Sequence, residues 1–157
     1  MSVALKPSTN YSEAARRHLV DAEFLFASNR KANSGQLYGF VAECGMKALL
    51  IACKVPTDID GGIAKKNPLN PKKGHPLRQH IPVLMDSIAA YGALIPDGAL
   101  AAKYMAIIYN VVHLKNWSID HRYWRESALP LASVTAWRTA AQDIGKMLDQ
   151  AKEDGVL

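Results

Sequence analysis

The stretch LYGFVAECGMKALLIA, residues 37–52, decides the fold that we predict for this chain. It is apolar on nearly every side, which is typical of a helix surrounded by other elements. Two charges, Glu43 and Lys47, nevertheless lie in its middle, and so do two glycines, Gly39 and Gly45. A buried carboxylate needs a charged or hydrogen-bonding partner, and a mid-helix glycine costs about 1 kcal/mol relative to alanine. The stretch therefore predicts a central helix with specific neighbours.

Two cations are candidate partners for the Glu43 carboxylate. Lys47 follows it by one helical turn, in the order that favours an ion pair. Arg122, in the segment DHRYWRE, is the partner that we favour, because a guanidinium can bind a carboxylate through two parallel hydrogen bonds. The sequence thus predicts a Glu43–Arg122 pair, with Lys47 as the alternative.

The two glycines form one patch of small residues with Ala42, because the three positions are spaced by three along a helix. Such a patch lets a neighbouring element come close and gain dispersion contacts. We interpret it as a site of tight helix packing. Room for a bound phosphate or base is the alternative.

Helical periodicity recurs along the whole chain, and strand signals are nearly absent. Asn10 and Glu13 resemble a capping box at the start of the first helix. The predicted helices cover about residues 11–30, 36–54, 82–91, 96–115 and 130–153. This pattern predicts an all-α fold, an antiparallel up-and-down bundle of four or five helices. We expect a single domain over residues 1–157, with its core at about 11–153.

A long basic loop separates the second and third predicted helices. Residues 55–76 hold four prolines, three glycines and four lysines, a composition that argues against regular structure. We expect a functional or mobile loop over about residues 55–77. Its lysines, Lys65, Lys66, Lys72 and Lys73, could contact phosphates of single-stranded RNA, or they could simply keep the loop in water.

Composition narrows the class of protein further. The net charge is +5, and no apolar run reaches the roughly 18 residues that span a bilayer. The N-terminus lacks the features of a secretory signal, so we expect a cytoplasmic protein without a membrane partner. Cys44 and Cys53 are too far apart on one helix to pair, and we expect two buried, reduced thiols. No cofactor motif appears, and HPLRQH lacks a third metal ligand, so we expect neither a cofactor nor a metal.

Several of these motifs together resemble the HEPN family, over about residues 12–152. The similarity includes an Asp-Ala pair in the first helix, the pattern Tyr-x-x-x-x-Glu-x-x-x-Lys-Ala-Leu-Leu in the second, a His-x-Leu segment before the third, and an Arg-Tyr pair before the last. These motifs correspond here to Asp21, Ala22, Tyr38, Glu43, Lys47, Ala48, Leu49, Leu50, His75, Leu77, Arg122 and Tyr123.

The resemblance implies an up-and-down bundle that forms a homodimer. Many HEPN proteins are RNA-cutting toxins or defence nucleases. Others are inactive modules that bind nucleotides or RNA, often beside a small nucleotidyltransferase. We therefore expect a toxin–antitoxin or defence context, with a nucleotidyltransferase-type protein as a possible partner.

The nuclease signature of that family, Arg followed four to six residues later by His, is absent, because none of the five histidines has an arginine at that spacing. We therefore expect a non-catalytic or weakly active module that binds RNA, a nucleotide or a protein. A metal-independent endoribonuclease that uses His121 with Arg122 or Arg125 is the first alternative. A purely structural module whose basic loop docks an acidic partner is the second.

The candidate site residues lie near the ends of the predicted helices. The histidines and arginines of residues 113–125 could form a cleft in a dimer, and the aromatic side chains nearby could stack on unpaired bases. The candidate catalytic residues are His121, Arg122 and Arg125. The candidate binding residues are Glu43, Lys47, His113, Asn116, Trp117, Tyr123, Lys65, Lys66, Lys72 and Lys73.

Overall fold

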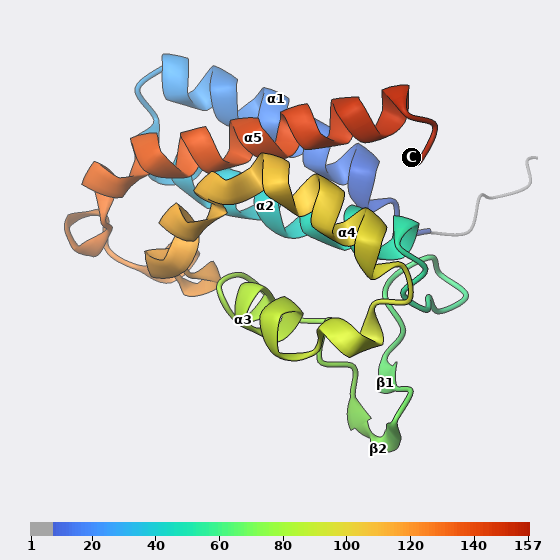
Figure 1. Ribbon diagram of the computed structural model, residues 1–157. Coiled ribbons are helices and arrows are strands. Elements are labelled where there is room, and N and C mark those ends of the chain that lie inside the picture. The colour runs from blue at the N-terminus through green and yellow to red at the C-terminus, as the bar shows by residue number, and fades with distance from the viewer. Residues whose placement is uncertain (1–7) are drawn as a thin grey trace, which may run out of the picture.

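A computed structural model describes residues 8–157 and has five α-helices packed against each other, with a small two-stranded hairpin between the second and the third (Figure 1). The α-helices are α1 (Tyr11–Ala27), α2 (Lys31–Ala52), α3 (Val83–Ala90), α4 (Gly98–Met105) and α5 (Val134–Glu153). The short 3₁₀ helices are η1 (Gly92–Leu94), η2 (Ala106–Asn116), η3 (Ile119–Tyr123), η4 (Glu126–Ala128) and η5 (Leu131–Ser133). The predicted helical bundle is confirmed.

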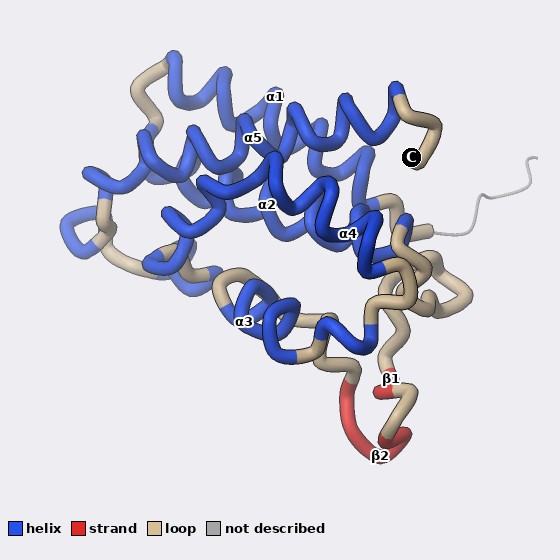
Figure 2. The backbone as a smooth tube through the Cα atoms, in the orientation of Figure 1, coloured by secondary structure: helices blue, strands red, loops and turns tan. Residues whose placement is uncertain are grey.

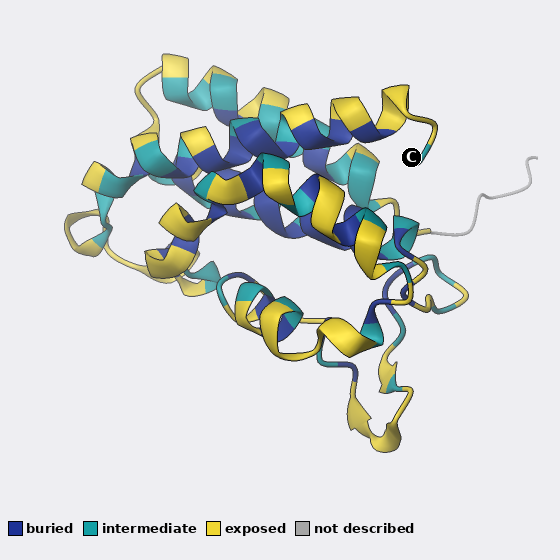
Figure 3. Ribbon diagram, viewed as in Figure 1, coloured by how far each residue is buried: buried dark blue, intermediate teal, exposed yellow. Residues whose placement is uncertain are grey.

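Helix α2 is the central element of the bundle. It packs against α1 and α5, and η2 also packs against α5. Most of its residues are buried, as the dark ribbon in Figure 3 shows. Helix α3 lies below the bundle and belongs to the segment that also carries the hairpin (Figures 1 and 2). The apolar stretch of residues 37–52 is thus enclosed by neighbouring elements, as predicted.

Several predicted helix boundaries were wrong. Helix α2 begins at Lys31 instead of residue 36, because the connection after α1 takes only three residues, 28–30. The predicted fourth helix is divided into α4 and η2, and Ile108 within η2 has non-helical backbone angles. The start of α1 is as expected, since the Asn10 side chain accepts a hydrogen bond from the Glu13 amide at 3.0 Å.

The long loop contains regular structure, contrary to our expectation. Strands β1 (Lys66–Asn67) and β2 (Asn70–Gly74) pair in antiparallel fashion, with Lys66 opposite Gly74 and Asn67 opposite Asn70. Asn67 stabilises the turn because its side chain accepts a hydrogen bond from the Leu69 amide at 2.8 Å. The loop thus contains a hairpin, which the composition alone did not reveal.

The small residues of α2 serve tight packing. A Cβ atom added at Gly39 would overlap the ring of Trp117, and one added at Gly45 would overlap the side chain of Ile144. Trp117 is 1% exposed and donates a hydrogen bond from Nε1 to the Gly35 carbonyl at 3.1 Å. Protein side chains therefore fill the patch, and no space for a phosphate or base remains there.

The expectation of two buried, reduced thiols is confirmed only in part. Both cysteines are free; Cys53 is buried and Cys44 is half-buried. Burial raises the pKa of each thiol to about 11, so both are protonated at neutral pH. Within residues 8–157, none of the helices is long and apolar enough to cross a membrane.

The contact between Gly39 and Trp117 predicts the effect of a single methyl group. Gly39→Ala should lower the free energy of unfolding by about 1–3 kcal/mol, because the buried ring must move. Gly98→Ala is the matched control: it is also helical, and nothing lies within 4 Å of its added Cβ. Urea denaturation measures both changes, and equal stability of the two variants would contradict this packing.

Candidate functional site

The Glu43 carboxylate is buried and paired, but not with the residue that we favoured. Lys47 donates a hydrogen bond from Nζ to Glu43 Oε1 at 2.7 Å, and the two side chains are only 7% and 10% exposed. The Lys47 Nζ also lies 5.7 Å from the centre of the Tyr11 ring. The alternative partner named from the sequence is therefore the one that the structure contains.

A second residue, His80, completes this cluster. Its Nδ1 lies 2.9 Å from Oε2 and 3.1 Å from Oε1 of Glu43. Arg122, in contrast, is exposed, and its guanidinium lies 4.6 Å from the ring centre of Tyr123. The predicted Glu43–Arg122 pair was wrong. The cluster of Glu43, Lys47 and His80 instead fastens the segment before α3 to the middle of α2.

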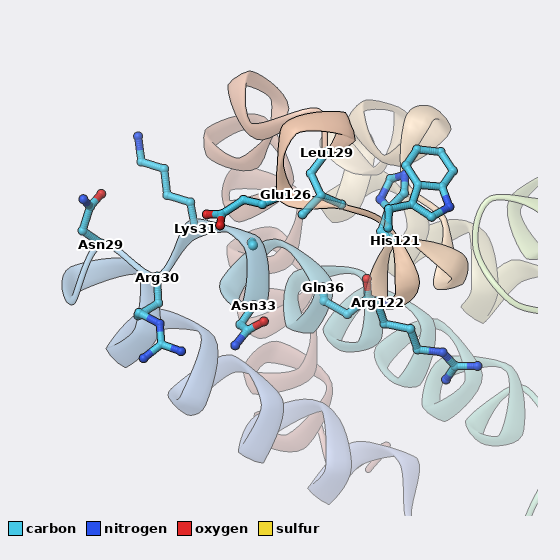
Figure 4. A pocket seen from close by; sticks show the side chains of 11 residues that line it. Asn29, Arg30, Lys31, Asn33, Gln36, His121, Arg122, Glu126 and Leu129 are labelled. Carbon is cyan, nitrogen blue, oxygen red and sulfur yellow. The ribbon is translucent and has the colours of Figure 1, made fainter.

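A cavity of about 320 Å³ lies at the N-terminal end of α2. It opens between the turn that joins α1 to α2 and the segment from η3 to η4 (Figure 4). The lining residues are Asn29, Arg30, Lys31, Ala32, Asn33, Gln36, His121, Arg122, Trp124, Glu126 and Leu129. Gln36 joins the two walls, since its Nε2 donates to the Ile119 carbonyl at 3.3 Å.

The border of this cavity is positively charged. Arg30, Lys31 and Arg122 form no ion pair with any residue from 8 to 157, and Glu126 is the one acid in the lining. Helix α2 has neither a side-chain cap nor an acid in its first turn. The amide groups and the dipole at this helix end therefore add to the positive potential. In Figure 4 the three long cationic side chains lie around the rim, on both walls.

His121 forms part of the cavity wall and is held in a fixed position. Its ring is stacked against Trp137, with centroids 5.7 Å apart, and meets Trp124 edge-on at 4.5 Å. Nδ1 accepts a hydrogen bond from the Ser118 amide at 3.4 Å, so the proton of the neutral ring is on Nε2. Burial lowers the pKa of His121, which keeps the ring neutral at pH 7.

Two other predicted binding residues have structural roles. Asn116 accepts a hydrogen bond from Trp137 Nε1 at 2.9 Å and donates one to Ser133 Oγ at 2.8 Å. Trp117 is buried against α2, where it cannot stack on a base. Both residues connect the end of η2 to its neighbours.

The predicted site residues therefore do not all lie together in the structure. Of the histidine and arginine set, His121 and Arg122 line the cavity, whereas His113 and Arg125 are exposed and do not. Tyr123 is exposed beside the cavity. The four lysines of residues 65–73 lie in or next to the β1–β2 hairpin, which follows the C-terminal end of α2, whereas the cavity lies at the N-terminal end of that helix (Figure 1).

The candidate residues named from the sequence did not include Arg30, Lys31, Asn33 and Gln36, nor Trp124 and Glu126. The first four lie at or between the predicted helix ends, residues 30 and 36, because α2 begins without a typical capping residue and its start at Lys31 was missed. The adjacent cations Arg30 and Lys31 at the start of an uncapped helix were the available signal. No three metal-binding side chains meet anywhere in residues 8–157.

No family model, curated protein or solved structure matches this chain.

The environment of His121 predicts a pH dependence of stability. Burial depresses its pKa in the folded state below the usual value of about 6.5, so folding disfavours the protonated ring. The contribution of the neutral His121 ring to the free energy of unfolding is complete above about pH 6.5 and should be lost as the pH drops below that value. His121→Phe should flatten this decline between about pH 7 and 5.

Urea denaturation at several pH values measures that slope, with the exposed His113→Phe as the control. His75 is also buried with a lowered pKa, so His121→Phe should remove only part of the decline. A slope that is the same in wild type and His121→Phe would show that the ring is not buried in its neutral form.

Proposed function

We propose that this protein is a HEPN-like module, non-catalytic or weakly active, that binds single-stranded RNA or a nucleotide in the cavity at the N-terminal end of α2. The observation that carries the proposal is the combination of an aromatic ring with three cations that form no ion pair within residues 8–157, all around one cavity. The cations are Arg30, Lys31 and Arg122, and the ring is Trp124.

The cations suit the phosphate part of such a ligand. Arginine and lysine without carboxylate partners are free to bind an anion, and charge-assisted hydrogen bonds are about twice as strong as neutral ones. The first turn of α2 supplies further amide donors on the same side. Glu126 opposes an anion, but the lining still carries two more cations than anions at neutral pH.

The aromatic ring suits the base. Trp124 is 48% exposed and is positioned by its edge-on contact with the buried His121. Stacking of an unpaired base on an aromatic side chain contributes about 1–3 kcal/mol and tolerates any base. A cavity of about 320 Å³ is within the range of small-molecule sites. The site thus favours a short stretch of unpaired nucleotides over a duplex.

RNA cleavage is the second candidate function, because His121 and Arg122 line the same cavity. A general base must offer a free ring nitrogen to the 2′-hydroxyl. In His121, Nδ1 is occupied by the Ser118 amide, and Nε2 already carries the proton. Arg125, the other candidate catalytic residue, does not line the cavity. Binding without efficient cleavage is therefore the better-supported proposal.

The proposal includes a cytoplasmic location and a protein partner, as expected from the sequence. Two free, protonated cysteines are compatible with a cytoplasmic location. Val20 and Phe24 are exposed one turn apart on α1, which would suit a homodimer or a nucleotidyltransferase-type partner in a toxin–antitoxin or defence pair. A purely structural interaction module is the remaining alternative.

The proposal predicts that Arg122 contributes much more to RNA affinity than the nearby Arg125. Arg122→Ala should weaken binding of a ten-nucleotide single-stranded RNA at least about tenfold, because a charge-assisted contact contributes about 1.5–3 kcal/mol. Arg125→Ala, which removes the same charge outside the cavity, should change affinity much less. Fluorescence anisotropy at low salt measures both variants.

Equal losses in the two arginine variants would show that general charge attraction, not the cavity, binds the RNA. No detectable binding by wild type would leave the structural module as the better account. Gel analysis of the same RNA tests cleavage, and fragments that disappear in His121→Ala would establish the endoribonuclease instead.

A further inference from the structure

A strongly basic hairpin projects from the molecule, at the opposite end of α2 from the cavity. We call residues 64–74 the basic arm; they comprise AKKNPLNPKKG, with four lysines and no acid. All four lysines are exposed, and none forms an ion pair with a residue between 8 and 157. In Figures 1 and 3 the strands extend away from the helices, and every residue of β2 is exposed.

Hydrogen bonds hold the base of the basic arm to the rest of the molecule. The His75 amide donates to the Lys65 carbonyl at 2.9 Å, and His75 itself is 2% exposed. Asp58 Oδ2 accepts from the Lys65 amide at 3.1 Å. Arg78 Nη1 donates to the carbonyl of the buried Ile63 at 3.2 Å. The charge is thus presented by a paired ribbon with a fixed base, unlike the lysines of a loose loop.

The charge lies on both sides of the turn of this hairpin. Lys65 and Lys66 precede the turn, and Lys72 and Lys73 follow it, in the stretch of β2 where the register against β1 shifts. Four cations thus lie close together on a narrow projection that can enter a groove. A groove with anions on both walls would contact both segments of the hairpin at once.

We propose that the basic arm enters the major groove of double-stranded B-form DNA and contacts phosphates on both walls. That groove is about 12 Å wide and admits a two-stranded β-ribbon. The major groove of A-form RNA is too narrow for side chains to read, so duplex RNA is a poorer fit. Because lysines contact phosphates, binding is independent of sequence and falls steeply with salt.

This inference is independent of the proposed RNA site. The cavity lies at the start of α2 and the basic arm beyond its end, and a 22-residue helix is about 33 Å long. The two sites share no residue. Either proposal can therefore be wrong while the other holds.

The test compares two charge-reversed variants in binding a 20-base-pair DNA by fluorescence anisotropy. Lys72→Glu/Lys73→Glu should weaken binding at least tenfold at 50 mM salt. It should also reduce the slope of log K against log salt by about 1.8, which corresponds to two lost phosphate contacts. Lys115→Glu/Lys152→Glu, two exposed lysines on η2 and α5, changes the net charge equally and should retain most of the affinity.

Duplex RNA of the same sequence and vesicles with anionic lipid serve as competing partners in the same assay. Wild type should bind the DNA duplex more tightly than either one. Equal losses in the two double variants would overturn the proposal, and so would stronger binding to duplex RNA, to the vesicles or to a polyglutamate peptide. Circular dichroism of both variants confirms that the helices remain folded.

Discussion

The burial of the Glu43 carboxylate is the constraint on which the arrangement of this molecule depends. A charge among apolar side chains is tolerated only with partners, and here Lys47 and His80 provide them at 2.7 and 2.9 Å. Lys47 comes from the same helix and needs no tertiary structure. His80 comes from the segment after the hairpin, so its contact attaches that segment to the bundle. One carboxylate thus links the central helix to the part of the chain that carries the basic arm.

Helix α2 lies between the cavity and the basic arm. Its middle is enclosed by Trp117 and Ile144, which occupy the spaces left by Gly39 and Gly45. Its N-terminal end opens into the cavity, where the helix dipole and the rim cations act in the same direction. Its C-terminal end leads into the hairpin segment. A buried helix therefore separates the cavity from the basic arm.

The sequence predicted the fold well because helical periodicity and an all-round apolar helix are local signals. It ranked Lys47 second to Arg122 as the partner of Glu43, and it missed His80, which lies 37 residues away along the chain. Trp117 looked like a loop aromatic, and its place against Gly39 became visible only in three dimensions. Arg30 and Lys31 were missed because α2 starts without a capping side chain, which hid the helix end and the cavity beside it.

The most direct test of this account is a pair of double-mutant cycles on the free energy of unfolding. The cycle of Glu43→Gln with Lys47→Met should give a coupling energy of about 0.5–3 kcal/mol, as expected for residues in contact. The cycle of Glu43→Gln with Arg122→Ala should give additive effects within about 0.5 kcal/mol. Additivity in the first cycle, or strong coupling in the second, would contradict the arrangement described for the central helix.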